Sequence, residues 1–399
     1  MGNLKPKKKV SLDEKLKAMD KMADDINAKA GKKIMGRLGR QKDIDEGILD
    51  KMRIKFIPTP SRNFNAATGG GFPRGLMTII AGLPDSGKTS LVLETIGMNM
   101  KRDPDFTVAW LESEDSLEEF YVTNTMGIDP NRFFLLEQRR EDAGEAALDR
   151  LEAAVASGYH DMIVVNSLKA IVPSEEFKKS LTENSVALQA RMNSKMVRKF
   201  ISPVSESDAA YIVVTHLSTE IGGYGDPLHI AGGKAILYAS SLIVDLRKKT
   251  VTDEDPIKKD EGIKIGVTVR KNHCAPHRNP YVKTDYYAIF GEGIEQYMTT
   301  LDAAVEQGVL TKAGMYIKDL DKDGNIRTLS DGTKLQFQGK KKFREFCIEN
   351  PDYFRDLQLR IDGEAETLSE DEIKELEAEE EAIAEAEAQE AKAREEEVS

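Results

Sequence analysis

The sequence predicts an α/β protein whose central sheet is mainly parallel, twisted and flanked by helices. Short apolar strand candidates alternate with helical patterns between residues 77 and 215, which is typical of a parallel sheet covered on both faces. A glycine-rich phosphate-binding pattern lies between the first strand and the first helix of this alternation. Polar side chains follow several of the strands, at the edge where ligands bind in open α/β sheets.

The composition is that of a globular protein with room for one large core and smaller units. The chain has 399 residues, of which 40% are hydrophobic and 32% are charged. No stretch of the sequence approaches the roughly 20 apolar residues of a membrane span. The N-terminus, MGNLKPKKKV, lacks the apolar segment of a secretory signal. Cys274 and Cys347 are too isolated for a disulfide framework or a zinc site, so we expect a cytoplasmic protein.

The net charge of −12 is unevenly distributed along the chain. Residues 362–399 carry 17 acidic and 3 basic side chains, a net charge of −14. The rest of the chain is therefore close to neutral or slightly basic. The acidic balance of the whole sequence does not argue against a nucleic-acid partner.

The alternation predicts the order of the core elements. The strand candidates are residues 77–81, 107–111, 162–166 and 210–215, and the helical patterns are 88–100, 116–126, 142–156 and 184–202. Three further strand-like runs, 241–246, 263–270 and 281–289, have no long helix between them and predict an antiparallel extension of the sheet.

We expect four regions. Residues 1–60 contain a basic arm, an N-terminal helix over 11–29 that serves self-assembly, and a linker. Residues 61–294 form the nucleotide-binding core, and residues 295–361 form a small α+β domain. Residues 362–399 are an acidic tail, disordered or partly helical, which is too charged for a packed core.

The strongest motif is a P-loop. The pattern G-x-x-x-x-G-K-[ST] follows the strand MTIIA and precedes a helical pattern, which is the context that such a loop requires. Backbone N–H groups and the start of the helix would surround the phosphates of ATP. Lys88 would supply a positive charge and Thr89 a hydroxyl ligand for Mg²⁺. The predicted ATP-binding residues here are Gly82, Leu83, Pro84, Asp85, Ser86, Gly87, Lys88, Thr89 and Ser90.

Side chains at the strand ends complete the candidate site. Glu112 and Glu114 end the second strand, where one carboxylate could orient the attacking water and Glu112 is a possible Mg²⁺ ligand. His216 ends the fourth strand and could sense a γ-phosphate. Asn166 ends the third strand at a place where nucleotide-binding proteins usually carry a carboxylate.

Several motifs, in order along the chain, resemble those of RecA-type recombinases. They are GKKIMGRLG (31–39), GGGFPRGLMTIIAGLPDSGKTS (69–90), LESEDSLEEFYVTNTMGIDPNRF (111–133), LQARMNSKMVRKF (188–200), RKNHCAPHR (270–278) and FGEGI (290–294). The resemblance covers about residues 31–350, and the chain's size and acidic tail are similar to the phage UvsX-like branch. It implies a RecA-like P-loop ATPase core.

The resemblance implies roles for individual residues. Glu114 matches the catalytic glutamate that activates water, and His216 matches the γ-phosphate sensor, for which many relatives have Gln. Tyr121 would stack on adenine, with Phe120 as the alternative. Lys271 and His273 match a basic pair that reaches a neighbouring subunit's ATP, where the family usually has Lys or Arg.

At position 166 the resemblance places an aspartate that contacts Mg²⁺ mostly through water. The amide oxygen of Asn166 can still accept a hydrogen bond from a metal-bound water, although the amide lacks the charge. We therefore expect a nucleotide site whose metal affinity and rate are altered, with hydrolysis retained.

The DNA contacts are also implied by the resemblance. Residues 173–186 and 217–233 resemble paired loops that line a filament axis. Arg191 and Arg198, seven residues apart, would share one helix face and contact phosphates. Ile221 would insert between base triplets, and the remaining predicted contacts of the second loop are Gly222, Gly232 and Gly233. Such binding is largely independent of sequence and sensitive to salt.

Together these features predict an ATP- and Mg²⁺-dependent DNA recombinase. It would form a helical filament on single-stranded DNA and catalyse homologous pairing and strand exchange in recombination, repair and recombination-dependent replication. The expected partners are single- and double-stranded DNA, further copies of the chain, a mediator and a single-strand-binding protein, with no membrane. The expected location is the bacterial cytoplasm, including that of a phage-infected host.

Two alternatives stay open. One is a helicase or translocase of the same fold, which would form closed rings. The other is a weakly catalytic paralogue that assists another recombinase, and Asn166 favours it.

Overall fold

The computed structural model describes residues 11–31, 33, 35–45, 53–137, 144–177, 186–219, 228–230, 233–275, 279, 281–321 and 324–363. The chain divides into two compact units, Met1–Lys55 and Phe56–Ser399. Within the described residues, no helix is both long and apolar enough to cross a membrane.

The first unit is built around helix α1 (Leu12–Ala30) and the short helix α2 (Gln41–Asp45). Ser11 caps α1, and the Ser11 and Glu14 side chains bond reciprocally to each other's backbone N–H groups, which satisfies two donors that a helix start leaves open. Gly31 ends α1 in the left-handed conformation, at φ 63°. The helix expected over 11–29 is thus present.

Ion pairs hold the segment after α1 against that helix. Arg37 binds both carboxylate oxygens of Asp20 at 2.8 and 3.0 Å, and Arg40 binds both oxygens of Asp24 at 2.8 and 2.9 Å. The buried carboxylate of Asp43 accepts a hydrogen bond from the Arg37 backbone N–H at 2.7 Å. Some of the charged side chains of α1 therefore have their ion-pair partners within the same chain.

The second unit contains a ten-stranded sheet with the order β12-β11-β10-β9-β3-β7-β6-β4-β5, and β8 pairs with β7 beside this path. The strands are β3 (Met77–Gly82), β4 (Val108–Glu112), β5 (Phe133–Glu137), β6 (Met162–Asn166), β7 (Ala210–Thr219), β8 (Leu228–Ile230), β9 (Leu242–Lys249), β10 (Gly262–Asn272), β11 (Lys283–Ile289) and β12 (Gly293–Ile294). Neighbouring strands pair parallel along the run β9, β3, β7, β6, β4 and β5. On the other side of β9, strands β10, β11 and β12 continue the sheet antiparallel. Strand β8 pairs antiparallel with β7.

The predicted antiparallel extension is wrong for its first strand. β9 pairs parallel with β3, because the short helix α8 (Lys234–Ala239) provides the crossover from β7 and β8. A six-residue helix is too short to show a helical period in the sequence.

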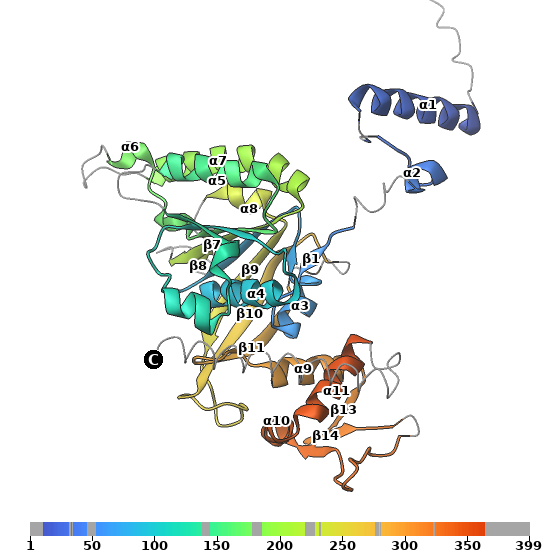
Figure 1. Cartoon of the computed structure of the whole chain (residues 1–399), viewed down its shortest axis with the longest axis vertical. Coiled ribbons are helices and arrows are strands. Elements are labelled where there is room, and N and C mark those ends of the chain that lie inside the picture. The colour runs from blue at the N-terminus through green and yellow to red at the C-terminus, as the bar shows by residue number, and fades with distance from the viewer. Residues whose placement is uncertain are drawn as a thin grey trace, which may run out of the picture. The chain divides into compact units, whose positions relative to one another are not determined.

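Helices cover both faces of the sheet, as Figure 1 shows. Helices α5 (Gly144–Ser157), α7 (Val186–Ser207) and α8 lie over one face, and α4 (Lys88–Arg102) and α3 (Arg62–Thr68) lie on the other. The shorter elements around them are β1 (Phe56–Ile57), β2 (Phe72–Pro73), α6 (Ser174–Phe177), the π-helix η2 (Tyr121–Thr125) and the 3₁₀ turns η3 (Pro130–Arg132) and η4 (Leu168–Ala170).

The helix expected over 116–126 is present over residues 119–125, and it begins later than predicted. Residues 113–118 are irregular, and the chain becomes helical just before η2, where the Met126 N–H reaches back to the Tyr121 carbonyl. The Glu112 carboxylate accepts the backbone N–H groups of Glu114 and Ser116, so this segment bonds to a side chain in place of its own backbone.

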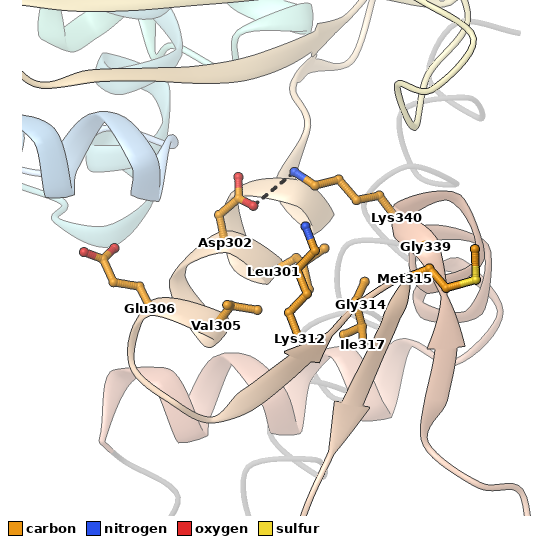
Figure 2. Close-up of a pocket in the computed structure, with 10 residues that line it drawn as sticks. All are labelled: Leu301, Asp302, Val305, Glu306, Lys312, Gly314, Met315, Ile317, Gly339 and Lys340. Carbon is orange, nitrogen blue, oxygen red and sulfur yellow. Dashed lines mark hydrogen bonds and ion pairs between the residues drawn. The ribbon is translucent and has the colours of Figure 1, made fainter.

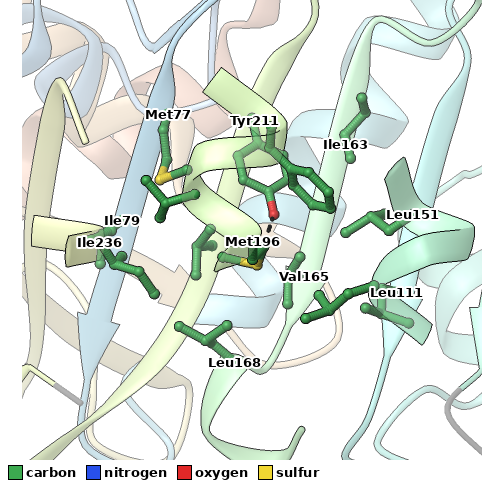
Figure 3. Packing of buried hydrophobic residues seen from close by; sticks show 14 of the residues in the cluster. Met77, Ile79, Leu111, Leu151, Ile163, Val165, Leu168, Met196, Tyr211 and Ile236 are labelled. Atoms are coloured by element: carbon green, nitrogen blue, oxygen red, sulfur yellow. Dashed lines mark hydrogen bonds between the residues drawn. The ribbon is translucent and has the colours of Figure 1, made fainter. Parts of the chain in front are cut away.

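The main core lies between the sheet and helices α5 and α7. Side chains of alternate strand positions, such as Ile79, Ile163 and Tyr211, point to this face and pack against Leu151 and Met196 of the helices (Figure 3). The Tyr211 hydroxyl lies 3.7 Å from the Met196 sulfur. The other strand positions, including Trp110, point to the α4 face by the same alternation.

A smaller module follows β12. It contains α9 (Gln296–Glu306), the antiparallel strands β13 (Leu310–Ala313), β14 (Tyr316–Asp319) and β15 (Gln336–Gln338), and the helices α10 (Gly339–Glu349) and α11 (Pro351–Asp362). Asp319 is fully buried and accepts two hydrogen bonds from Arg360 of α11, at 2.7 and 3.1 Å. Arg62 of α3 binds both carboxylate oxygens of Asp362, at 2.6 and 2.9 Å, which ties α11 to the core.

Candidate functional site

The phosphate loop connects β3 to α4. Gly82 ends the strand, Gly87 caps the helix at φ 79°, and Asp85 adopts a positive φ of 57° between them. A Cβ on Gly82 would lie 2.3 Å from the Ser86 hydroxyl oxygen and 2.6 Å from the Leu246 carbonyl oxygen. The loop is thus a tight cradle of backbone at a helix start, which is the arrangement that binds phosphate groups.

Lys88 points back into this loop. Its ammonium group donates to the Leu83 carbonyl at 2.8 Å, and the side chain is only 6% exposed. Burial lowers the pKa of Lys88, while the carboxylates of Glu114 and Asp85 oppose that shift. Lys88 thus lies where a phosphate oxygen could replace the carbonyl as its partner.

Thr89 and Asn166 meet beside the loop. The Thr89 hydroxyl donates to the amide oxygen of Asn166 at 3.3 Å. Asn166 is fully buried at the end of β6. Both oxygens are uncharged, and oxygens of this kind can ligate Mg²⁺ directly or through a water molecule.

Glu112 lies on the opposite side of Asn166. In the parallel register of β4 and β6, Glu112 pairs directly with Asn166, and the Asn166 amide nitrogen donates to Glu112 Oε2 at 3.0 Å. Glu112 Oε2 also accepts from the indole N–H of Trp110 at 2.8 Å. Glu112 Oε1 accepts from Glu114 N at 3.0 Å and from the Ser116 hydroxyl at 3.2 Å. Both carboxylate oxygens therefore already have protein donors.

Glu114 lies just past the end of β4, beside Ser167, which directly follows β6, and His216 of β7. The sequence placed His216 at the end of its strand, but β7 continues to Thr219. One of its carboxylate oxygens accepts a hydrogen bond from the Ser167 hydroxyl and lies 2.7 Å from His216 Nε2. Burial alone would raise the pKa of Glu114, but the hydrogen bonds from Ser167 and His216 outweigh it and lower the pKa below its ordinary value. His216 pairs in register with Gly82 of the phosphate loop, so β3 and β7 place the two side by side.

Tyr121 faces the helix that follows the loop. Its hydroxyl lies 3.3 Å from the Ser90 hydroxyl, and the side chain is half-buried. Phe120, the alternative from the sequence, is 65% exposed and has no aromatic partner among the described residues. The contact with Ser90 favours Tyr121 as the residue nearer to the phosphate loop.

Lys271 is the second-last residue of β10, and His273 directly follows the strand. The Lys271 ammonium donates to the carbonyl oxygens of Leu237 at 3.0 Å and Tyr238 at 3.1 Å, both in the last turn of α8. Burial lowers the pKa of Lys271. His273 is exposed. The structure does not bring this pair to the phosphate loop of its own chain.

Arg191 and Arg198 lie exposed on α7, as their spacing predicts. Lys195 is also exposed, one turn from Arg191 and one from Arg198. These three side chains form the α7 basic stripe, whose members lie within about 60° of the helix circumference at 100° per residue. Lys195 is a residue that the sequence reasoning missed, although its spacing of four and three from the two arginines is visible in the sequence.

Much of the predicted DNA-binding loops falls outside the described residues. Ile221, Gly222 and Gly232 belong to that part of the chain, as does most of the first loop. Gly233 is described at φ 86°, where it precedes α8 and approaches Ala190 of α7. The end of the second loop therefore lies beside the start of the α7 basic stripe.

A pocket of about 460 Å³ lies elsewhere, in the C-terminal module (Figure 2). Leu301 and Ile317 contribute apolar walls, while Lys340 and Asp302 form an ion pair at 3.2 Å across its rim. Its lining shares no residue with the phosphate loop or the Glu114 cluster.

ATP and Mg²⁺ fit the residues around the phosphate loop. The loop excludes a Cβ at Gly82, and Lys88, Thr89 and Asn166 converge beside it. Among the described residues, no group of three or more His, Cys, Asp or Glu side chains could hold a metal by itself. A metal at this site would therefore be held chiefly by Thr89, by water on Asn166 and by the nucleotide.

The fold and the site define a P-loop nucleotide-binding α/β protein. The sequence model of the RecA N-terminal domain matches residues 17–295. RecA of Aquifex pyrophilus is 30% identical over 353 residues, covering 88% of this chain and 92% of that protein. RecA of Thermus aquaticus is 31% identical over 354 residues, covering 88% and 94%. The chain belongs to the RecA family.

Among solved structures, the RadB recombinase is similar with a TM-score of 0.44 and 18% identity. That similarity covers 58% of this chain and 96% of the RadB chain.

Proposed function

We propose that this chain is an ATP-dependent DNA recombinase that forms a helical filament on single-stranded DNA and catalyses homologous pairing and strand exchange. Membership of the RecA family supports the general activity. The observation that carries the proposal is the Glu114 carboxylate, held by Ser167 and His216 beside the phosphate loop. A chain that had lost hydrolysis would have no need to keep these three side chains together.

The residues of the site divide the work of hydrolysis among them. Lys88 and the backbone of the loop would bind phosphate oxygens, and Thr89 and Asn166 would hold Mg²⁺. Bound Mg²⁺ would offset negative charge on the phosphates. Glu114 remains ionised because its pKa is lowered, so it can accept a proton from water. The His216 side chain contacts this carboxylate, and its backbone pairs with Gly82 in the register of β3 and β7. This position suits a residue that responds to a bound phosphate.

The α7 basic stripe supports DNA binding by the chain. Three exposed positive charges on one helix face, beside the end of the second loop, suit contacts with successive phosphates. The stripe contains no described aromatic side chain for base stacking. Its contribution to affinity should therefore be electrostatic, independent of sequence and weakened by salt.

Two features support assembly into a filament. Lys271 and His273 lie away from the nucleotide site of their own chain, which suits side chains that serve a neighbouring subunit. Leu12 and Met19 are 72% and 52% exposed on one face of α1, with Leu16 between them. An apolar stripe on a helix near the chain start suits docking on a second copy.

The acidic tail and the length of the chain support the phage UvsX-like branch. In that setting the chain would act in an infected bacterial cytoplasm, with a mediator and a single-strand-binding protein as partners. These finer assignments extend the family-level function.

Three measurements test the proposed function. Steady-state ATP hydrolysis should rise on addition of single-stranded DNA, electron microscopy with ATP and DNA should show helical filaments, and homologous DNAs should exchange strands. Closed rings would support a helicase or translocase. Absence of hydrolysis with DNA binding retained would support a paralogue that assists another recombinase.

A further inference from the structure

Glu112 is the most heavily hydrogen-bonded carboxylate of the nucleotide site. It is 5% exposed and accepts from Trp110, Asn166, Ser116 and the backbone of Glu114. A buried carboxylate without a cationic partner is costly unless donors surround it. Since both oxygens already have donors, Glu112 is poorly placed to ligate a metal as well.

This network fixes which way the Asn166 amide points. The Asn166 nitrogen faces Glu112 at 3.0 Å, so the Asn166 oxygen must face the Thr89 hydroxyl at 3.3 Å. The reversed amide would bring its oxygen against the Glu112 carboxylate, so that two acceptors would face each other at about 3 Å. The negative charge of Glu112 therefore selects the orientation in which Asn166 presents an acceptor to the phosphate-loop side.

An aspartate at position 166 would place a second carboxylate about 3 Å from Glu112 in a buried site, and like charges at that distance repel strongly. The amide that stands there instead donates to Glu112 and accepts from Thr89.

We infer that Glu112 is a positioning residue for the metal site, and that Glu112 and Asn166 form one unit in which the carboxylate orients the amide oxygen toward Thr89 and metal-bound water. The inference deepens the proposed function and depends on it for the role of Mg²⁺. The pairing of Glu112 with Asn166 itself is independent of nucleotide.

Four proteins test the inference: the unaltered chain, Glu112→Gln, Asn166→Asp and the double variant. The first measurement is the melting temperature without nucleotide or Mg²⁺. Asn166→Asp should lower it when Glu112 is present, because two carboxylates then face one another. Asn166→Asp should not lower it further in the Glu112→Gln background, where an amide can donate to the new carboxylate.

The second measurement is the Mg²⁺ dependence of binding to a fluorescent ATP analogue. When Asn166 is present, Glu112→Gln should weaken the Mg²⁺-dependent affinity for the analogue roughly tenfold, as loss of a group that orients a metal ligand usually does. The same change should have little effect beside Asn166→Asp, because a carboxylate presents an oxygen in either orientation. Trp110 is the chain's single tryptophan and donates to Glu112, so its emission reports that this cluster remains folded in each variant.

Each alternative predicts a different pattern. If Glu112 ligated the metal directly, Glu112→Gln would weaken Mg²⁺-dependent binding equally in both backgrounds. If Glu112 were only structural, Glu112→Gln would lower the melting temperature in both backgrounds and leave the Mg²⁺ dependence unchanged. Either result overturns the inference. Failure of the unaltered chain to bind the analogue would instead overturn the proposed function, and the nucleotide-free melting temperatures would still decide whether the two side chains are coupled.

Discussion

At the scale of single residues, the nucleotide site depends on side chains that are buried and whose partners are therefore specific. The Lys88 side chain is 6% exposed and its ammonium group donates to the Leu83 carbonyl, a partner that a phosphate oxygen could replace. Glu114 shares one carboxylate oxygen between Ser167 and His216. The chemistry of the site thus rests on a few contacts, each of which a single substitution can remove.

Lys88→Ala should abolish ATP hydrolysis, because it removes the ammonium group that points into the phosphate loop. Lys101→Ala is the matched control, since Lys101 is an exposed lysine on the same helix. Steady-state release of phosphate measures both. Turnover of Lys88→Ala at the unaltered rate would contradict the assignment of the loop.

At the scale of elements, helix α4 links the phosphate loop to the far edge of the sheet. Glu94 on α4 accepts the backbone N–H of Ile294 in β12 at 2.6 Å. A Cβ on Gly293 would lie 2.7 Å from a Glu94 oxygen, so this approach requires glycine at that position. Burial raises the pKa of Glu94 from its ordinary value of 4.5 to about 7, although the hydrogen bond from Ile294 opposes the shift.

Glu94→Gln should change how stability depends on pH. Because the folded-state pKa is raised, the folded chain binds the proton more tightly, and this contribution to stability is present below about 4.5 and is lost as pH rises through about 7. The variant should therefore melt close to the unaltered protein at pH 5 and a few degrees higher at pH 8. Glu349→Gln, at an exposed carboxylate, is the control in thermal melts across this range. An equal shift at both pH values would argue against a buried titrating Glu94.

The α7 basic stripe is the second feature that belongs to this scale. Arg191→Ala combined with Arg198→Ala should retain nucleotide binding and lose the stimulation of hydrolysis by DNA. Each lost phosphate contact should reduce the slope of log affinity against log salt by about one. Lys101→Ala with Arg102→Ala removes the same charge from exposed positions of α4 and should change neither property. Unchanged DNA affinity of the stripe variant would refute the proposed contact.

At the scale of the whole molecule, ionic contacts attach the C-terminal module to the core immediately before the acidic tail. Arg62 holds Asp362 through two hydrogen bonds, and Asn63 donates to Asp302 at 2.9 Å. Gly363 ends α11 at φ 76°. Removal of the tail must therefore spare Asp362 and Gly363 if the module is to stay in place.

If the acidic tail competes with DNA for basic surfaces, a chain that ends after Gly363 should bind duplex DNA more tightly than the full chain at low salt. The difference should fade as salt screens both interactions. A chain that ends after Ile361 is the informative comparison, since it also loses the partner of Arg62 and should melt at a lower temperature. Equal duplex affinity of the full chain and the chain that ends after Gly363 would remove the idea that the tail is a brake.

The sequence predicted the parallel core and the phosphate loop because both depend on short-range patterns. The strands around residues 79, 110, 164 and 213 and the loop before Lys88 lie where they were expected. The contact between Glu112 and Asn166 was not predicted, because the two residues are 54 positions apart and only the register of β4 and β6 brings them together. Helix α8 was missed because it is short, and with it the parallel pairing of β9.

Helix α8 has a different neighbouring feature at each of its ends. Gly233, at the end of the second proposed DNA loop, precedes it, and the carbonyl oxygens of Leu237 and Tyr238 in its last turn hold the Lys271 ammonium. Six residues of α-helix span only ~9 Å, which is fewer than two turns. The same six residues therefore adjoin the proposed second DNA loop at one end and, at the other, a lysine proposed to serve the nucleotide of a neighbouring subunit.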